Sequence, residues 1–537
     1  MKKTLKRAKI MSAIVLLSLM FQCLCPINVL AESDSFALQN YYHSDYESYS
    51  DIIANGDKLE QQAYAEGIVM LKNEDNALPI PEGSKISVFS KNSNYYNIRE
   101  YLAKSGYEVN PTLVEFYKNN ALSGDGVGTM PSNGQTVAGF HTGETPVSMY
   151  RDTEINSFSD YNDAAVVIIH RYSGEGYDAP RTMMWDGEQY GNWNSNSTQL
   201  VPGARQEDDH YLQLDQNETD MIALAAEHFE KVVVILFTPS SFETGFLDDP
   251  GHYAYQENIK AALYIGYPYN QASKTNVLGD LMQGEINPSG RLVDTWARDF
   301  KLDPTWNNFG NNLSEVGNTK GNAYNNVAYG AGSSKGSYYN NYVTYNEGIY
   351  VGYRYWETRG YTEGSTAYSS AGKGTADPFF SLDKDGDNEI HGTTTTEWDN
   401  WYQAHVVFPY GYGLSYTSYT QEIVGITPDS DKITSETQIK IQVKVTNTGS
   451  MAGKEVVQIY YTSPYYNGQI EKAHVVLGAF GKTENLQPGE SQLVTLTLNA
   501  RDMASYDYSD ANGNGFKGYE LEAGTYAIRL MKNAHEE

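Results

Sequence analysis

KVVVILF, residues 231–237, is an uninterrupted run of apolar, mostly β-branched residues behind a single lysine. A short apolar run without alternation is typical of a strand that is buried on both faces. Residues 165–170 (AVVIIH) form a second such run and residues 259–265 a third, while residues 216–229 carry apolar side chains at the spacing of an amphipathic helix. Strands that alternate with helices predict an α/β sandwich, a mostly parallel sheet with helices on both faces.

A different pattern fills the C-terminal part of the chain. Turn sequences such as NTGS (447–450) and QPG (487–489) separate short segments with alternating apolar residues. The segments predicted as strands are residues 438–446, 455–461, 475–480, 492–499 and 524–530. Short strands at this spacing predict an all-β sandwich after the α/β part.

Composition divides the remaining chain. From about residue 303 to residue 401 Gly, Asn, Ser, Thr and Tyr dominate, which predicts elaborated loops around one ordered island at residues 345–356. These loops would complete the α/β part and link it to the sandwich. The predicted divisions are 1–31 (signal segment), 32–57 (polar segment), 58–302 (α/β domain), 303–420 (elaborated loops) and 421–537 (β-sandwich).

The N-terminus has the features of an export signal. A basic head precedes the apolar run Ile10–Phe21, and Val29-Leu30-Ala31 provides a cleavage site. We favour cleavage and secretion, although an uncleaved segment is long enough to anchor the protein in a membrane. Cys23 and Cys25 both lie inside this segment, so the mature chain would have no disulfide and no Cys-ligated metal.

The composition also limits the partners. A formal charge of −29 disfavours nucleic acid and anionic membrane surfaces, so we expect no nucleic-acid partner and no stable membrane partner. The 45 Tyr residues suit a sugar-binding surface, but β-rich structure with decorated loops explains them at least as well. An acidic extracellular enzyme with a neutral substrate fits this composition.

Four motifs occur in a recognisable order. They are AEGIVMLKN (65–73) followed by LPI (78–80), GDLMQGEINPSGR (279–291), residues 345–355 together with PYGYGLSY (409–416), and VKVTNTGSMAGKEVVQIY (443–460). In this order they resemble glycoside hydrolase family 3. The first two are similar to the opening and the end of the family's α/β sandwich domain, and the last is similar to its fibronectin-III-like module. The resemblance covers residues 59–530.

The resemblance implies a retaining β-glycosidase, with β-glucosidase as the expected activity and a β-linked oligosaccharide or glycoside as the substrate. Family members hold their nucleophile, an Asp, in a (β/α)₈ barrel that these residues do not contain. We therefore expect a permuted arrangement, with the barrel beyond residue 537 of a longer chain or in a separate subunit. The alternative is a carbohydrate-binding accessory protein that has lost the barrel and catalyses nothing.

A glutamate follows the strand predicted at residues 165–170. RYSGEGYD (171–178) resembles the family's acid/base loop, and this resemblance implies that Glu175 is the general acid/base. The physical expectation agrees, because such sheets present functional groups beyond the carboxyl ends of their strands. Gly174 and Gly176 would let the backbone turn sharply around Glu175. The alternative is an exposed glutamate in a surface turn.

Three further residues of this loop are candidates for substrate binding. Asp178 and Arg181 are expected to pair, either to position a sugar hydroxyl or to brace the loop, and Trp185 could stack on a sugar ring or anchor the loop. Glu188 and Glu207 are alternative acids. His170 ends the strand and is interpreted as a structural histidine. No cluster of residues has metal-ligand spacing, and no metal or cofactor is expected.

Overall fold

The computed structural model describes residues 45–91, 98–119, 142–171, 203–206, 209–267, 276–308, 323–324, 340–341, 345, 347–363, 396–466 and 469–537. The predicted signal segment therefore lies outside the described residues. Helix α2 spans Tyr49–Gly67 and therefore begins within the predicted polar segment 32–57. In the described part of the chain, no helix combines the length and the apolar character that a membrane span requires.

A six-stranded sheet forms the centre of the α/β domain, in the order β1-β6-β5-β4-β2-β3. Neighbouring strands are parallel except for the pair of β1 and β6. The bounds are β1 Val69–Asn73, β2 Lys85–Phe89, β3 Glu108–Val109, β4 Ala164–His170, β5 Val232–Phe237 and β6 Ile259–Tyr264. The three strands predicted from their apolar runs are confirmed as β4, β5 and β6.

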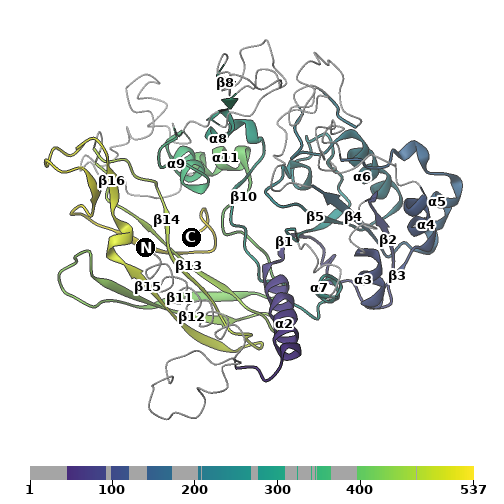
Figure 1. The fold of residues 1–537 in the computed structure, drawn as a ribbon, viewed down its shortest axis with the longest axis horizontal. Helices are drawn as coiled ribbons and strands as arrows, with labels where there is room; N and C mark the ends of the chain where they lie inside the picture. The colour runs from purple at the N-terminus through teal and green to yellow at the C-terminus, as the bar shows by residue number, and fades with distance from the viewer. Residues whose placement is uncertain are drawn as a thin grey trace, which may run out of the picture. The chain divides into compact units, whose positions relative to one another are not determined.

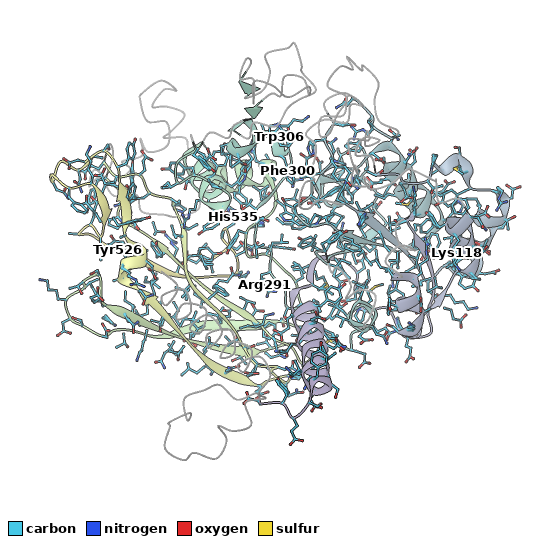
Figure 2. The ribbon with its side chains drawn as sticks, viewed as in Figure 1. Lys118, Arg291, Phe300, Trp306, Tyr526 and His535 are labelled. Carbon is cyan, nitrogen blue, oxygen red and sulfur yellow. The ribbon has the colours of Figure 1, made fainter. Side chains whose placement is uncertain are left out.

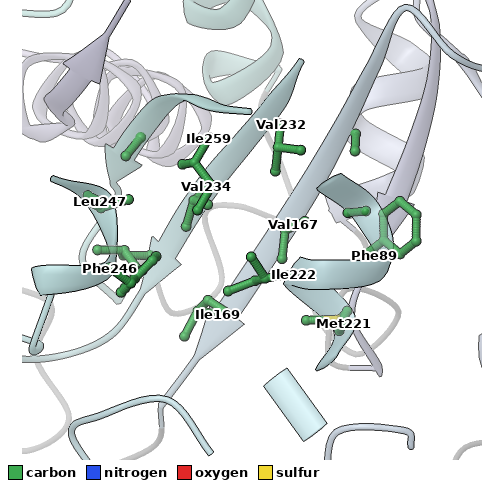
Figure 3. Close-up of a cluster of buried hydrophobic side chains, with 14 of the residues drawn as sticks. Phe89, Val167, Ile169, Met221, Ile222, Val232, Val234, Phe246, Leu247 and Ile259 are labelled. Carbon is green, nitrogen blue, oxygen red and sulfur yellow. The ribbon is translucent and has the colours of Figure 1, made fainter. Parts of the chain in front are cut away.

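Helices cover both faces of this sheet (Figure 1). Alternate side chains of β4 point to opposite sides, so Val167 and Ile169 join one hydrophobic cluster while Val166 and Ile168 join the other. Figure 3 shows the first of these clusters, in which Met221 and Ile222 pack over the strands. That face is covered by α4 (Pro111–Asn119), α5 (Asp152–Ser157) and α6 (Gln216–His228), the other by α3 (Ile98–Lys104) and α7 (Val277–Gln283).

The C-terminal part is a sandwich of two three-stranded antiparallel sheets, ordered β11-β12-β15 and β14-β13-β18. The bounds are β11 Tyr419–Pro428, β12 Gln438–Asn447, β13 Val456–Thr462, β14 Val476–Lys482, β15 Ser491–Asn499 and β18 Ala527–Met531. Alternate residues of β12 and β15 enter the shared core. The five predicted strands are confirmed, whereas β11 was not predicted because none of its residues is fully buried.

The region predicted as elaborated loops is partly helical. Its described elements are α8 (Pro304–Asn308), α9 (Tyr353–Glu363), α11 (Thr396–His405), the short pair β8 (Ala323–Tyr324) and β9 (Asn340–Asn341), and β10 (Val406–Phe408), which pairs with β7 (Trp296–Ala297). Trp356 of α9 and Tyr402 of α11 are buried in one cluster with Ala297 and Val406. The prediction of loops is wrong for these helices, because single buried aromatics stabilise otherwise polar sequences.

The four motifs behind the family resemblance meet at one junction. Gly290 donates its N–H to the carbonyl of Ile68 at 3.1 Å, and Leu414 donates to Met70 at 2.9 Å. A Cβ on Gly290 would lie 2.6 Å from the carbonyl oxygen of Gly67 and closer still to that of Ile68. The backbone around Gly290 therefore packs directly on the segment that opens the sheet, at a distance that only glycine permits.

Polar contacts join the same segments to the sandwich. Arg291, labelled in Figure 2, makes an ion pair with Glu455 at 3.0 Å. Lys454 makes another with Glu66 at 2.7 Å, and Lys482 lies 3.4 Å from the same carboxylate. Burial opposes ionisation of Glu66, but hydrogen bonds from Lys454 and Gln62 and the charge of Lys482 lower its pKa to about 2. Glu66 is thus an anion at any pH near neutrality.

Replacing Gly290 by Ala should destabilise the protein, because the new methyl group meets backbone that cannot move aside. We expect Gly290→Ala to lower the free energy of unfolding by roughly 3 kcal/mol. Gly67→Ala is the matched control, since its Cβ would meet nothing within 4 Å. Denaturant unfolding checks both variants, and equal effects would contradict the close backbone contact.

Candidate active site

The candidate active site lies at the edge where the parallel strands β2, β4 and β5 end at their carboxyl termini. Strand β4 ends at His170 and is followed by Arg171, after which the predicted acid loop begins. Glu175, Asp178, Arg181, Trp185 and the alternative acids Glu188 and Glu207 lie outside the described residues. The described residues therefore form the two segments of chain that flank this loop, which we call its first and second roots.

Arg171 anchors the first root. Its guanidinium is fully buried and donates to both carboxylate oxygens of Glu218, at 2.6 and 2.7 Å. The same side chain donates to the backbone carbonyls of Tyr211 and Gln213, the latter at 2.6 Å. Its backbone N–H donates to Phe237 at the end of β5. A planar donor with this many fixed partners locks the backbone four residues before Glu175.

Burial and neighbouring charges shift the pKa values of Arg171 and His170 at this root. Burial alone would lower the pKa of the Arg171 guanidinium, but the charge and the hydrogen bonds of Glu218 outweigh it and raise that pKa. Burial, assisted by the adjacent guanidinium, lowers the pKa of His170 to about 3. His170 is therefore neutral near physiological pH and packs edge-on against Phe237 at 5.0 Å. This environment agrees with the predicted structural role of the imidazole.

The start of α6 anchors the second root. Asp215 caps the helix by accepting the N–H of Glu218 at 2.8 Å, and Glu218 accepts the N–H of Asp215 at 3.1 Å. Thr142 donates its hydroxyl to the other oxygen of Asp215. Gln216 donates its N–H to the carbonyl of Gly203, the first described residue after the loop, at 2.7 Å. Both ends of the acid loop are thus tied to one helix terminus.

Glu144 is a buried carboxyl group at this edge with a pKa shifted to near neutrality. Burial raises its pKa to about 7, against hydrogen bonds from the N–H groups of Thr145 and Lys91 that favour the anion. Lys91 lies just beyond the end of β2, so Glu144 joins the segment around residue 144 to the carboxyl end of that strand. The carboxyl is only 3% exposed and therefore cannot reach a substrate in this conformation.

Aromatic residues pack around His210, in the segment that follows the loop. The His210 imidazole lies 2.9 Å from the Glu243 carboxylate and stacks on Phe300, with ring centroids 5.9 Å apart. Trp306 lies on the same imidazole at 4.9 Å (Figure 2 labels Phe300 and Trp306). Glu243 also accepts the N–H of Phe300 at 2.7 Å. This cluster fixes the segment that carries Tyr211 and Gln213, the carbonyl partners of Arg171.

The described carboxylates of the edge serve to hold its shape. Glu144, Asp215 and Glu218 are all buried and all accept hydrogen bonds inside the protein. Among the described residues, no group of three or more His, Cys, Asp or Glu side chains is arranged to bind a metal ion. The sequence pattern did not single out Arg171 or Glu144, but the spacing of Asp215 and Glu218 is a capping-box signature that could have been recognised.

Comparison with known proteins identifies both parts of the chain. Residues 68–353, more than half of the chain, match the profile of the glycosyl hydrolase family 3 C-terminal domain. Residues 455–534 match a fibronectin type III-like domain. Both predicted domain types are therefore confirmed.

The relatives that match over most of the chain are named as β-glucosidases. The chain is 28% identical over 509 residues to beta-glucosidase A of Butyrivibrio fibrisolvens, covering 88% of this chain and 49% of that protein. It is 25% identical to thermostable beta-glucosidase B of Acetivibrio thermocellus, over 89% of this chain and 47% of that protein. A solved β-glucosidase from Paenibacillus barengoltzii aligns with a TM-score of 0.61 and 26% identity, over 89% of this chain and 42% of that one. The chain thus spans about half the length of the curated relatives it matches.

Glu218→Ala should destabilise the protein strongly, because it leaves the Arg171 guanidinium buried without its counter-charge. We expect a loss of about 3 to 5 kcal/mol in the free energy of unfolding. Glu227→Ala, on the exposed side of the same helix, is the matched control and should cost less than about 1 kcal/mol. Denaturant unfolding of both variants decides the point, and similar losses would mean that the buried pair contributes little.

Glu144→Gln should change how stability depends on pH. The folded-state pKa of Glu144 is raised above the unfolded value, so its contribution is fully present below about pH 4.5 and is lost as the pH rises through about 7. The wild type should therefore lose stability between pH 4.5 and pH 8, and Glu144→Gln should not. The free energy of unfolding of the variant minus that of the wild type should rise by roughly 2 to 3 kcal/mol over this range.

Glu154→Gln is the control for this pH effect, because the hydrogen bonds from Arg151 lower the pKa of Glu154. Its contribution is present above the unfolded pKa and is lost as the pH falls, so the trend should have the opposite sign. Thermal unfolding from about pH 8 down to about pH 3 measures both variants, because the Glu154 contribution is lost only below its unfolded pKa. Parallel stability curves for wild type and Glu144→Gln would refute the shifted pKa.

Proposed function

Because the chain belongs to glycosyl hydrolase family 3, we propose that it supplies the general acid/base of a retaining β-glycosidase. The observation that carries the proposal is the anchored root of the acid loop. Arg171 is locked by Glu218 at the carboxyl end of β4, four residues before Glu175. A carboxyl group in this position would project from the edge at which α/β sheets bind their ligands.

The proposed chemistry needs two carboxyl groups, about 5–5.5 Å apart. Glu175 would protonate the glycosidic oxygen as the leaving group departs and would then deprotonate the water that releases the sugar. The second carboxylate would attack the anomeric carbon and form the covalent glycosyl intermediate. We assign the second carboxylate to a barrel domain outside these residues, as the family resemblance implies.

A β-linked glucoside is the proposed substrate, because the relatives that match over most of the chain are named as β-glucosidases. Asp178, Arg181 and Trp185 would then contact the sugar from the same loop as Glu175. The basic and apolar N-terminal segment supports secretion, so the substrate would be an extracellular oligosaccharide. A negative net charge is compatible with a neutral sugar and unfavourable for a polyanionic one.

Glu175→Gln tests the acid assignment in the enzyme assembled with its barrel domain. We expect kcat for cellobiose to fall by roughly 10²- to 10⁴-fold, because its poor leaving group needs protonation. Dinitrophenyl β-glucoside, whose leaving group needs no proton, should be cleaved with a much smaller loss in the glycosylation step. Steady-state kinetics with both substrates measure the difference.

Glu188→Gln, a change in the same loop, is the matched control and should leave both substrates nearly unaffected. Near-native cleavage of cellobiose by Glu175→Gln, or a large loss in Glu188→Gln, would refute the assignment. The 537-residue chain alone should bind sugar without hydrolysing nitrophenyl β-glucoside. Turnover by the chain alone at a normal rate would show that the nucleophile lies within it.

A further inference from the structure

A small hairpin in the sandwich carries a group of exposed aromatic side chains. Strand β16 (Ser505–Asp507) pairs antiparallel with β17 (Gly518–Glu520), with Tyr506 directly opposite Tyr519 (Figure 1 labels β16). The exposed aromatics are Tyr506 (52%), Tyr508 (73%), Phe516 (53%) and Tyr519 (74%). Single exposed aromatics are common on protein surfaces, but a cluster on one hairpin marks an interaction site.

Two rings of this hairpin, those of Tyr506 and Tyr519, pack against each other, and a third, that of Phe516, lies over the neighbouring Gly518. The Tyr506 and Tyr519 centroids are 5.0 Å apart, with the ring planes inclined at 60°. Phe516 folds back over Gly518, where an added Cβ would lie 2.8 Å from its ring. Side chains alternate along a strand, so Tyr506 lies on the side opposite the buried Asp507. We call these four residues the aromatic hairpin surface.

Hydrogen bonds hold the tip of the hairpin in one conformation. Asp507 accepts the N–H groups of Ser509 and Ala511, at 2.9 and 2.7 Å. Asp510 accepts the N–H of Gly515 at 2.9 Å, and the amide groups of Asn512 and Asn514 both donate to Glu520. Because the support is already ordered, little conformational freedom would be lost when a ligand binds the rings.

The chemistry of the surface selects the class of ligand. Tyrosine rings offer flat apolar faces with a hydroxyl at the edge, which matches a pyranose ring with its C–H face and equatorial hydroxyls. The carboxylates of Asp507, Asp510 and Glu520 lie on the same hairpin, within a chain of net charge −29. This charge opposes polyanions and is compatible with neutral glycans.

We propose that the aromatic hairpin surface is a second glycan-binding site, which holds a neutral β-glucan chain outside the catalytic centre. The choice of β-glucan rests on the proposed function, because a β-glucosidase acts on the ends of such chains. Binding one part of a polymer would raise the local concentration of its ends near the enzyme. Small glycosides, which are too short to gain from this effect, would be unaffected.

The 537-residue chain with the double substitution Tyr506→Ala and Tyr519→Ala tests this site. We measure retardation in gels that contain mixed-linkage β-glucan and titrate cellohexaose by calorimetry. Two lost stacking contacts should weaken binding by roughly tenfold or more. Tyr506→Phe with Tyr519→Phe keeps the rings and should keep most of the affinity, and thermal unfolding shows whether each variant folds.

Phe480→Ala is the matched control, because Phe480 is a 68% exposed aromatic on β14 of the same sandwich. It should bind β-glucan like the wild type. Equal binding by the double alanine variant, or no binding by the wild type, would overturn the proposal. So would equal retardation by carboxymethyl cellulose, or a dimer that the double alanine variant dissociates without any change in glucan binding.

The binding experiment is independent of catalysis, so it separates this site from the acid assignment. Glu175→Gln should be retarded by β-glucan as strongly as the wild type. If the hairpin variant loses binding while Glu175→Gln keeps normal catalysis, the hairpin site stands and the acid assignment fails. If Glu175→Gln loses catalysis while the hairpin variant still binds β-glucan normally, the acid assignment stands and the hairpin site fails.

Discussion

The Arg171 guanidinium is buried at the end of β4, and the cost of burying this charge dictates the arrangement around it. An unpaired charge in this position would be too costly for the fold, so Glu218 must lie opposite it and the backbone carbonyls of Tyr211 and Gln213 must point inward. Glu218 is the third residue of α6 and completes its capping box with Asp215. One charge therefore sets the start of a helix, the path of residues 209–215 and the backbone that leads into the acid loop.

A second constraint acts where the α/β domain meets the sandwich. Two positions there have no room for a side chain. Gly290 and Gly413 let three backbone segments stack, and a methyl group at either position would meet carbonyl oxygens. The ion pair of Arg291 with Glu455 then joins this stack to the sandwich. The glycines and paired charges in the motifs of the resemblance therefore have a structural part in this junction. The motifs therefore identify the scaffold of the family more directly than its chemistry.

The sequence predicted the elements whose signal is local. β4, β5 and β6 are continuous apolar runs because both faces of their sheet are covered, and such runs are readable without neighbours. β11 and the helices α9 and α11 were missed because their stability comes from contacts with distant segments, as in the packing of Trp356 beside Tyr402. The candidate site shows the same limit. A glutamate between two glycines can be recognised in the sequence, but the pairing of Arg171 with Glu218 depends on a contact across the fold.

The distribution of charge connects the scaffold with the proposed ligands. The chain has 38 Lys and Arg against 67 Asp and Glu. In the described part of the chain, several of the basic side chains are committed to structural pairs, as Arg171, Arg291 and Lys472 are with Glu218, Glu455 and Glu522. The charge of each of these cations is balanced by its partner, and the chain keeps an excess of carboxylates in its composition. Recognition by such a chain must come from stacking and neutral hydrogen bonds, which are the interactions that a sugar ring offers to Tyr506 and Tyr519. The same charge imbalance therefore argues for a neutral glycan at both the acid loop and the aromatic hairpin surface.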